Sequence, residues 1–191
     1  MASERIAILF DIDGTLIITG GAGAASWRLA FDELYGIPAD IGKFTDAGMT
    51  DPDVGRKTFE AVLNRKPERK EFSRLLERRL HYLHTTVAES KQYRVLPGVE
   101  ELLPKLIEGG YLLGLVTGNV EAAAHIKLHR AQLNRFFSFG GVGAGRRLPR
   151  DLAAGACRVR HGGRDRLGLV GGRRCDDQGA AGRAEDRPQS H

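Results

Sequence analysis

The chain has 191 residues, enough for one core domain and a modest second lobe. Hydrophobic residues make up 41% of it and charged residues 28%, a balance that excludes a disordered or membrane-embedded protein. The net charge of +5 is weak evidence for nucleic-acid binding, because residues 1–140 carry 18 basic and 18 acidic residues, and the excess lies in a tail, residues 141–191, without Phe, Tyr or Trp.

The first predicted element is a buried parallel strand over residues 5–11, a short apolar and β-prone run closed by polar and glycine residues. Its apolar part, from Ile6 to Phe10, is too short for the apolar segment of a signal peptide. No later run approaches the ~18 apolar residues of a membrane span. We therefore expect a cytoplasmic protein that does not associate with membranes.

Helices dominate the prediction for residues 20–90. Apolar residues recur at helical spacing over residues 26–36, and the glycine at the end of this segment is expected to terminate the helix. Thr50 and Pro52 indicate the start of a second helix, because a capping hydroxyl is followed by proline in the first turn. A third helix is predicted over residues 72–87, where apolar residues follow one another at steps of three and four.

The pattern then changes to alternating helices and strands. The predicted elements are a helix over residues 99–108, a strand over 111–116, a helix over 120–133 and a strand over 136–139. Alternation of this kind is typical of an open parallel sheet with helices on its faces. The sequence therefore predicts an α/β fold that is interrupted by a helical insertion after the first strand.

The tail does not continue this alternation. Residues 141–191 contain 11 Gly and 11 Arg but no Ile, Lys, Phe, Tyr or Trp, so little in them favours strands. GC-rich coding DNA read out of frame produces such a composition. We hypothesise a frameshift near residues 140–145, which the coding DNA tests: another reading frame should continue the fold with an apolar strand ending in Asp.

Two carboxylates follow the first strand directly, at Asp11 and Asp13 in the string DIDGTL. Such side chains project into the crevice at the carboxyl ends of parallel strands, where open sheets of this kind bind ligands. Magnesium needs hard oxygen ligands of this type. A calcium loop is excluded, because the glycine is fourth rather than sixth and Ala22 occupies the twelfth position, where a glutamate is required. The two residues alone would also fit a plain Asp-Gly turn.

These residues carry a resemblance to a known family. The string DIDGTL, the helical stretch after it and the segment LLGLVTGN, which ends at Asn119, resemble phosphatases of the haloacid dehalogenase superfamily, and most closely the phosphoglycolate-phosphatase-like branch. The resemblance covers residues 5–140. It implies a Rossmann-like core formed by residues 1–19 and 91–140 and a helical cap formed by residues 20–90. From its composition we expect residues 141–191 to be an aberrant, poorly ordered tail.

The resemblance also implies a role for each matching residue. Asp11 would be the nucleophile that forms an aspartyl-phosphate, and Asp13 the general acid and then the general base. Magnesium would contact the Asp11 carboxylate and the Asp13 backbone carbonyl. Thr117 would hydrogen-bond the phosphoryl group together with backbone N–H groups near Gly118 and Asn119, although judged alone Thr117 fits a helix cap better.

An acid at position 13 favours phosphate esters within the superfamily, because the dehalogenase and phosphonate-cleaving branches have an aromatic or a small residue there. The resemblance therefore implies a magnesium-dependent phosphatase that acts on a small phosphorylated metabolite, with phosphoglycolate as the leading candidate. A helical cap would close over that substrate and exclude water from it.

The tail departs from the family pattern, which requires a later Lys or Arg and a Gly-Asp-x-x-x-Asp motif. No lysine follows Lys127, and the arginines at positions 146 and 147 are weak substitutes for it. Gly172 and Asp176 stand where the two acids of the motif belong, a faint likeness. One alternative is therefore a catalytically inactive remnant of such an enzyme, and a weaker one is a nucleic-acid binder that uses its basic tail.

Overall fold

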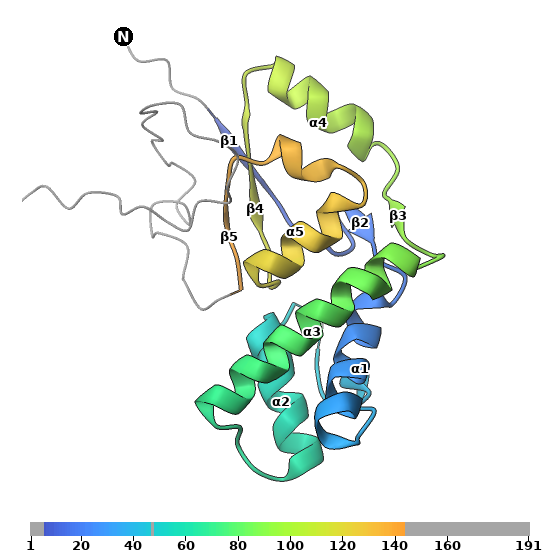
Figure 1. Cartoon of the computed structure of the whole chain (residues 1–191). Helices are drawn as coiled ribbons and strands as arrows, with labels where there is room; N and C mark the ends of the chain where they lie inside the picture. Colours follow the sequence, from blue (N-terminus) through green and yellow to red (C-terminus); the bar gives the residue numbers. More distant parts are fainter. Residues whose placement is uncertain (1–5, 47, 144–191) are drawn as a thin grey trace, which may run out of the picture.

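The computed structural model describes residues 6–46 and 48–143, which form two lobes (Figure 1). The sheet lobe contains a three-stranded parallel sheet in the order β1-β4-β5, with α4, α5 and a short 3-10 helix, η2. Its elements are β1 (Ala7–Phe10), α4 (Val99–Glu108), β4 (Leu112–Val116), α5 (Glu121–His129), η2 (Leu133–Phe136) and β5 (Phe139–Gly141). The predicted α/β fold with a Rossmann-like parallel sheet is confirmed.

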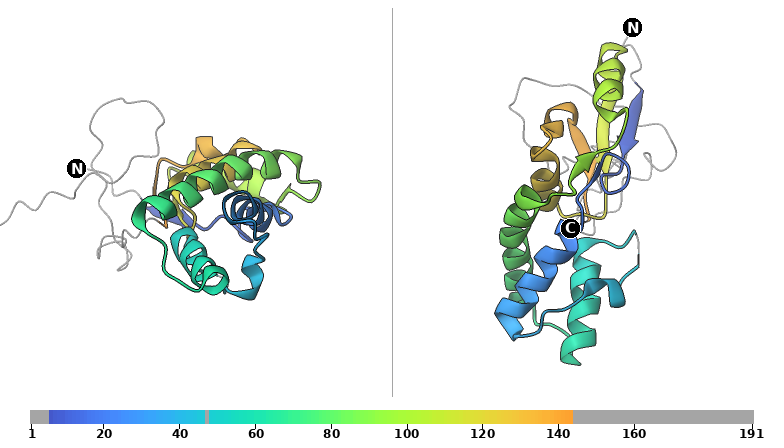
Figure 2. Two further views of the ribbon diagram at one scale, coloured as in Figure 1. Left: turned by 60° about the horizontal axis from the view of Figure 1, so that its bottom comes forward. Right: turned by 90° about the vertical axis from the view of Figure 1, so that its right-hand side faces the viewer.

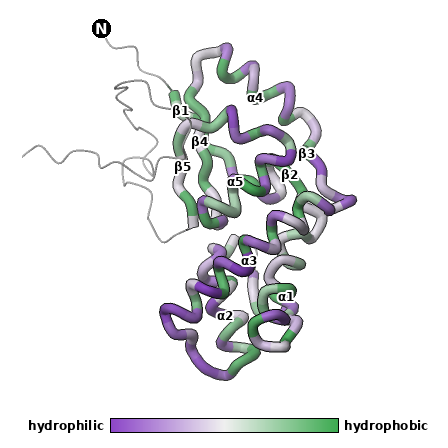
Figure 3. The backbone as a smooth tube through the Cα atoms, viewed as in Figure 1, coloured by the Kyte–Doolittle hydropathy of each residue, from purple (hydrophilic) through white to green (hydrophobic). Residues whose placement is uncertain are grey.

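The helical lobe is built by the chain between β2 and β3. Its elements are α1 (Ala22–Tyr35), the 3-10 helix η1 (Ile41–Lys43), α2 (Asp51–Leu63) and α3 (Arg69–Glu89). Thr50 caps α2 by accepting a hydrogen bond from the amide of Asp53, and proline follows in the first turn. The turn between α2 and α3 is hydrophilic, whereas the strands of the sheet lobe are mostly hydrophobic (Figure 3).

A two-stranded antiparallel ribbon connects the lobes. It pairs β2 (Ile17–Ile18), which follows the turn after β1, with β3 (Arg94–Val95), which returns the chain to the sheet lobe. Both strands have backbone hydrogen bonds that fix where the helical insertion leaves and re-enters the sheet lobe. The carboxyl ends of β1 and β4 consequently face the helical lobe (Figure 1).

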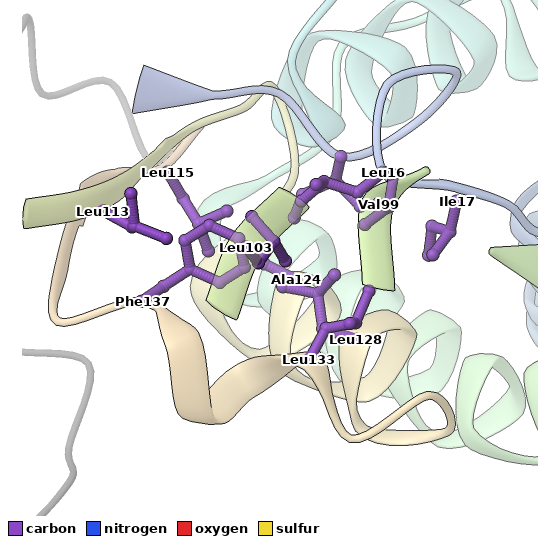
Figure 4. Close-up of a cluster of buried hydrophobic side chains, with 11 residues drawn as sticks. Leu16, Ile17, Val99, Leu103, Leu113, Leu115, Ala124, Leu128, Leu133 and Phe137 are labelled. Atoms are coloured by element: carbon purple, nitrogen blue, oxygen red, sulfur yellow. The ribbon is translucent and has the colours of Figure 1, made fainter. Parts of the chain in front are cut away.

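Each lobe has its own hydrophobic core. In the sheet lobe, α4 and α5 pack against the same face of the sheet (Figure 2), and the buried side chains between them are aliphatic apart from one phenylalanine (Figure 4). They are Ile12, Leu16, Ile17, Val99, Leu103, Leu113, Leu115, Ala124, Leu128, Leu133 and Phe137. The core of the helical lobe is largely aromatic and contains Trp27, Phe31, Phe59 and Phe72.

Two predicted boundaries are wrong. The strand predicted over residues 136–139 is instead Phe139–Gly141, and the helix predicted over 120–133 ends at His129 and is followed by η2. Phe137 belongs to the core and not to a strand, since it links η2 to β5 and is buried. The strand itself is glycine-rich because it lies very close to β4: a Cβ on Gly140 would lie 2.8 Å from the carbonyl oxygen of Leu115.

Several predictions concern residues 144–191 and lie outside the described residues. These are the frameshift and aberrant-tail hypotheses, the substitute arginines at positions 146 and 147, and the faint acidic motif at Gly172 and Asp176. Within residues 6–46 and 48–143, no helix is both long and apolar enough to cross a membrane.

Candidate active site

The turn after β1 presents two carboxylates around a buried anchor. Ile12 is completely buried in the core of the sheet lobe, whereas Asp11 and Asp13 on either side of it are exposed. The turn closes when the amides of Leu16 and Ile17 donate to the carbonyl of Ile12, at 3.0 and 3.1 Å. Because Ile12 points into the core, the side chains of the residues on either side of it, both acidic, lie on the outer side of the turn.

Gly14 makes this turn possible. Its φ of +81° lies in the left-handed region, which strains residues with a Cβ, and its amide donates to the carbonyl of Ile17 at 2.9 Å. The glycine of the DIDGTL string therefore has a conformational role, and the Asp-Gly turn and the acidic pair are parts of one structure.

The loop after β4 lies beside this turn. In the parallel register Phe10 pairs with Leu115, so the chain leaves both strands at the same edge of the sheet. Thr117 and Asn119 are buried at that edge. The amide of Thr117 also donates to the carbonyl of Gly141 at 3.1 Å, which extends the pairing between β4 and β5 into the loop.

One side-chain amide joins the two loops. Asn119 Nδ2 donates to Asp13 Oδ2 at 2.8 Å and to Thr117 Oγ1 at 2.7 Å. Asp13, Thr117 and Asn119 are therefore brought together, and Asp11 lies at the same edge of the sheet, two residues before Asp13. Gly118 lies between Thr117 and Asn119, and its carbonyl accepts a hydrogen bond from the helical lobe, as described below.

Lys127 completes this cluster. It lies on α5, and its Nζ is 2.9 and 2.7 Å from the two carboxylate oxygens of Asp13. The lysine side chain is 6% exposed and that of Asp13 45%, so a buried cation meets a half-exposed acid. Sequence reasoning searched for a cation after Lys127 and did not assign Lys127 itself.

A signal for Lys127 was present in the sequence. On α5 the buried residues are Ala123, Ala124, Lys127 and Leu128, so a lysine occupies the apolar stripe that faces the sheet. A lysine in such a stripe must reach either solvent or a buried partner. Here the lysine reaches the half-exposed carboxylate of Asp13.

The helical lobe brings a second ion pair to the same place. Asp51 at the start of α2 accepts a hydrogen bond from Arg79 Nη2 at 2.9 Å, and its other oxygen accepts from the amide of Val120 at 2.8 Å. The amide of Asp51 donates to the carbonyl of Gly118 at 2.7 Å. The helical lobe is thus bonded directly to the loop that carries Thr117.

Burial lowers the pKa of Arg79, and the nearby carboxylates of Asp51 and Asp13 oppose this effect. The guanidinium of α3 therefore lies within electrostatic reach of the acid that binds Lys127. Two acids and two cations from both lobes converge at the carboxyl ends of β1 and β4.

A comparison with protein families shows to which family the chain belongs. Residues 8–143 match the family model described as haloacid dehalogenase-like hydrolase. The matched segment includes the turn after β1, the loop after β4, the helical insertion and Lys127. The chain belongs to the haloacid dehalogenase-like hydrolases. The family resemblance predicted from DIDGTL and LLGLVTGN is confirmed. A comparison with curated protein sequences gives no match.

Solved structures of haloacid dehalogenase-like proteins share this fold. A predicted phosphoglycolate phosphatase from Haemophilus somnus is 20% identical, with a TM-score of 0.56, over 76% of this chain and 65% of that one. CbbY from Rhodobacter sphaeroides, solved with phosphate, is 17% identical, with a TM-score of 0.55, over 74% and 65%. A predicted phosphatase from Clostridium acetobutylicum is 19% identical, with a TM-score of 0.51, over 73% and 62%.

The chain therefore spans slightly less than two thirds of the length of these structures. At such identities the similarity concerns the fold: a parallel sheet with a helical lobe inserted after its first strand. The roles of individual residues must be argued from the geometry of this chain itself.

The oxygen atoms at the end of β1 are of the kind that magnesium binds. The amides that close the turn donate to the carbonyls of Ile12 and Ile17, and not to that of Asp13. The Asp13 carbonyl and the exposed Asp11 carboxylate are hard oxygen ligands, and Mg²⁺ is commonly bound by one or two carboxylates plus substrate phosphate. Within the described residues no group of three or more His, Cys, Asp or Glu side chains forms a metal cluster.

Proposed function

We propose that this haloacid dehalogenase-like hydrolase is a magnesium-dependent phosphatase that hydrolyses a small phosphate monoester. The observation that carries the proposal is the cluster in which Asp13 is bonded to both Asn119 and Lys127, beside Thr117 and two residues after Asp11. This arrangement supports Asp11 as nucleophile, Asp13 as acid, and Thr117 and Lys127 as groups that contact the phosphoryl oxygens.

In the first half of the reaction, a carboxylate oxygen of Asp11 attacks phosphorus and the bond from phosphorus to the alcohol oxygen breaks. Asp13, protonated at that stage, gives its proton to the leaving oxygen, so that the alcohol departs neutral. In the second half, water attacks the phosphorus of the aspartyl-phosphate and Asp13 takes its proton. The bond to Asp11 breaks, and inorganic phosphate leaves.

The buried partners of Asp13 position it and balance its charge. Asn119 fixes one oxygen from the β4 loop, and Lys127 donates to both. When a phosphate dianion enters, its oxygens compete for the ammonium group, which lies beside a carboxylate that is open to solvent. Lys127 would then serve as the cation of the family pattern, and the hydroxyl of Thr117 would contact the phosphoryl group together with amides near Gly118.

Magnesium would be held by the Asp11 carboxylate and the Asp13 carbonyl, where it supplies positive charge that stabilises the transferring phosphoryl group. A small substrate is favoured because Asp51, which accepts from the amide of Val120 and donates its own amide to Gly118, ties the helical lobe directly to the β4 loop. Phosphate was observed in CbbY, and xylulose-1,5-bisphosphate in a mutant of it, which supports a phosphorylated substrate here. Phosphoglycolate remains the leading candidate.

The test is hydrolysis of p-nitrophenyl phosphate by the full-length chain with magnesium. We expect turnover that chelation with EDTA abolishes, and Asp11→Asn should reduce it by about a thousandfold or more, since the covalent step depends on this oxygen. Asp32→Asn removes an exposed carboxylate on α1 and serves as the matched control with unchanged turnover. Absence of turnover in folded wild-type protein, or its persistence in folded Asp11→Asn, would contradict the proposal and favour an inactive remnant.

A further inference from the structure

The side chain of Tyr93 inserts its hydroxyl into the last turn of α5. The hydroxyl donates to the carbonyl of Lys127 at 2.8 Å. In a helix that continued past His129, this carbonyl would accept from the amide of Ala131. Burial raises the pKa of Tyr93, and the charge of Arg130 and a hydrogen bond from the Ala131 amide oppose this effect. The hydroxyl therefore takes the place of one helical hydrogen bond, which explains why α5 is shorter than its sequence pattern predicts.

The ring of Tyr93 is held by the residue that follows α5. The guanidinium carbon of Arg130 lies 4.6 Å from the centre of that ring. The same guanidinium donates through Nη1 to the carbonyls of Val87 and Ser90, the latter at 2.9 Å. These carbonyls lie at the end of α3, where helical partners run out and a cation is favourable. Arg130 and Tyr93 therefore join the ends of α3 and α5.

The helix α5 is consequently bonded to the helical insertion at both of its ends. At its start, the amide of Val120 donates to Asp51, which Arg79 of α3 also holds. At its end, Tyr93 reaches it from the segment between α3 and β3. Lys127 lies next to the second of these points, and its own backbone carbonyl is the atom that the tyrosine contacts.

The chemistry of Lys127 makes a fixed backbone valuable at this point. Its four-carbon stem is flexible, yet its ammonium group must stay within hydrogen-bond distance of both carboxylate oxygens of Asp13. Misplacement of a catalytic group by about 1 Å can reduce the rate about a hundredfold. Because Tyr93 holds the backbone of Lys127 itself, loss of its hydroxyl should loosen the turn from which the lysine side chain starts.

We propose that Tyr93 is a positioning residue, whose hydroxyl fixes the last turn of α5 so that Lys127 holds Asp13 in the geometry that phosphoryl transfer requires. The inference rests on the proposed phosphatase function and adds to it a residue that acts through Lys127 and not on the substrate. Arg130 keeps the tyrosine ring in place and extends this support to the end of α3.

The first experiment is a double-mutant cycle on phosphatase activity. Tyr93→Phe keeps the ring beside Arg130 and loses only the hydroxyl, and it should reduce kcat for p-nitrophenyl phosphate about tenfold with little change in KM. In the Lys127→Met background the same change should have no further effect on kcat, since no ammonium group is left to position. Tyr111→Phe, which alters an exposed tyrosine next to the start of β4, should leave kcat unchanged in both backgrounds.

The cycle separates positioning from general support of the fold. If Tyr93 supported only the fold, its loss would reduce kcat by the same factor in both backgrounds, and that result would overturn the inference. An unchanged kcat in Tyr93→Phe would overturn it as well, while leaving the phosphatase proposal standing.

A second measurement does not depend on turnover. In NMR spectra of isotope-labelled protein, an ammonium group held by a carboxylate exchanges its protons slowly enough to be seen, and Lys127→Met identifies this signal by its loss. The exchange with water should be at least about fivefold faster in Tyr93→Phe and unchanged in Tyr111→Phe.

The outcomes of this measurement distinguish the two proposals. Equal exchange in Tyr93→Phe and the wild-type protein, or no such signal in the wild-type protein, would overturn the positioning role. If the faster exchange is found in a protein that does not hydrolyse the ester, the phosphatase proposal fails, and the support of Lys127 by Tyr93 stands.

Discussion

The two lobes each bring one ion pair to their junction, and the pairs differ chiefly in the burial of the acid. Arg79 Nη2 and Asp51 Oδ1 are 2.9 Å apart, and their side chains are 1% and 10% exposed. Lys127 Nζ and Asp13 Oδ2 are 2.7 Å apart, and their side chains are 6% and 45% exposed. Both cations are buried to a similar degree. Only Asp13 is open to solvent, so only the pair of the sheet lobe can exchange its partner for a ligand without losing a buried contact.

This difference divides the work between the lobes. The acid of the helical lobe is fixed from three directions, because Asp51 accepts from Arg79 and Val120 and donates its amide to Gly118. The acid of the sheet lobe, Asp13, lies in the turn after β1 and accepts hydrogen bonds from Asn119 and Lys127. The buried pair joins the lobes, whereas the open pair leaves a carboxylate accessible to solvent.

The largest expected effect comes from breaking the buried pair. Arg79→Met should lower the free energy of unfolding by about 3–5 kcal/mol, because Asp51 would remain buried without its cation. Urea denaturation measures this loss. The double variant Arg79→Met with Asp51→Asn should be more stable than the single one, since no buried charge is left unpaired. A loss below about 1 kcal/mol for the single variant would contradict the assigned burial of the pair.

Breaking the open pair should have the opposite profile. We expect Lys127→Met to reduce kcat by about 10²- to 10³-fold, as loss of one preorganised donor does, while the unfolding free energy changes by less than about 1 kcal/mol. The stability change is small because methionine fills the same space and Asp13 can be solvated. Phosphatase assays and urea denaturation of the same sample check both numbers, and Lys105→Met on the exposed side of α4 is the matched control.

Both cations were missed in the sequence for the same reason. On α3 the buried residues are Phe72, Leu75, Arg79, Leu83 and Val87, so Arg79 stands one turn after one leucine and one turn before another. Lys127 occupies the same kind of place on α5. Sequence reasoning followed the apolar residues and treated charged ones as the solvent side, whereas a cation inside the stripe was the informative exception.

The strands and loops were easier to predict. The apolar runs of β1 and β4 and the polar strings after them can be read locally, because each strand is short and ends at a motif. Two contacts of the site join residues that are far apart in the sequence: Asn119 bonds to Asp13 within the sheet lobe, and Asp51 accepts from Val120 across the two lobes. Such pairings have no local signature, so the motifs could be located while most of the contacts that connect them could not.

A smaller effect is expected where the lobes touch without an ion pair. A Cβ on Gly118 would lie 2.6 Å from the carbonyl oxygen of Met49, so Gly118→Ala should push the start of α2 away from the β4 loop. We expect kcat/KM to fall about tenfold through misplacement of the loop. The amide of Val120, which Asp51 now protects, should exchange its hydrogen faster.

The control for this variant is Gly23→Ala, where the added Cβ meets only Lys127 Nζ at 3.9 Å, an ordinary contact. Its Val120 amide should exchange at the wild-type rate. If Gly118→Ala also leaves that rate unchanged, the lobes are not held together at this point, and the buried pair does not have the bridging role assigned to it.

The smallest effect concerns the exposed ion pair between Arg78 and Glu33. Arg78 is the neighbour of Arg79 on α3. Glu33 accepts hydrogen bonds from Arg78 and Tyr82, and these bonds, Arg78 first, lower its pKa below the ordinary value of about 4.5. Because the pKa is lower in the folded chain, the pair stabilises above that ordinary value, and the contribution is lost as the pH falls through the folded pKa. Solvent screens the pair, so the contribution is small even at neutral pH.

Glu33→Gln should therefore lower the melting temperature by no more than a few degrees at pH 7, and the difference from wild type should vanish in acid. Added salt should reduce the difference at pH 7, because screening weakens exposed pairs. Arg79→Met should keep most of its larger deficit at the same salt concentration, since its pair is shielded from solvent. Equal salt sensitivity of the two variants would mean that neighbouring arginines on α3 experience the same environment, and the distinction between buried and open pairs would fail.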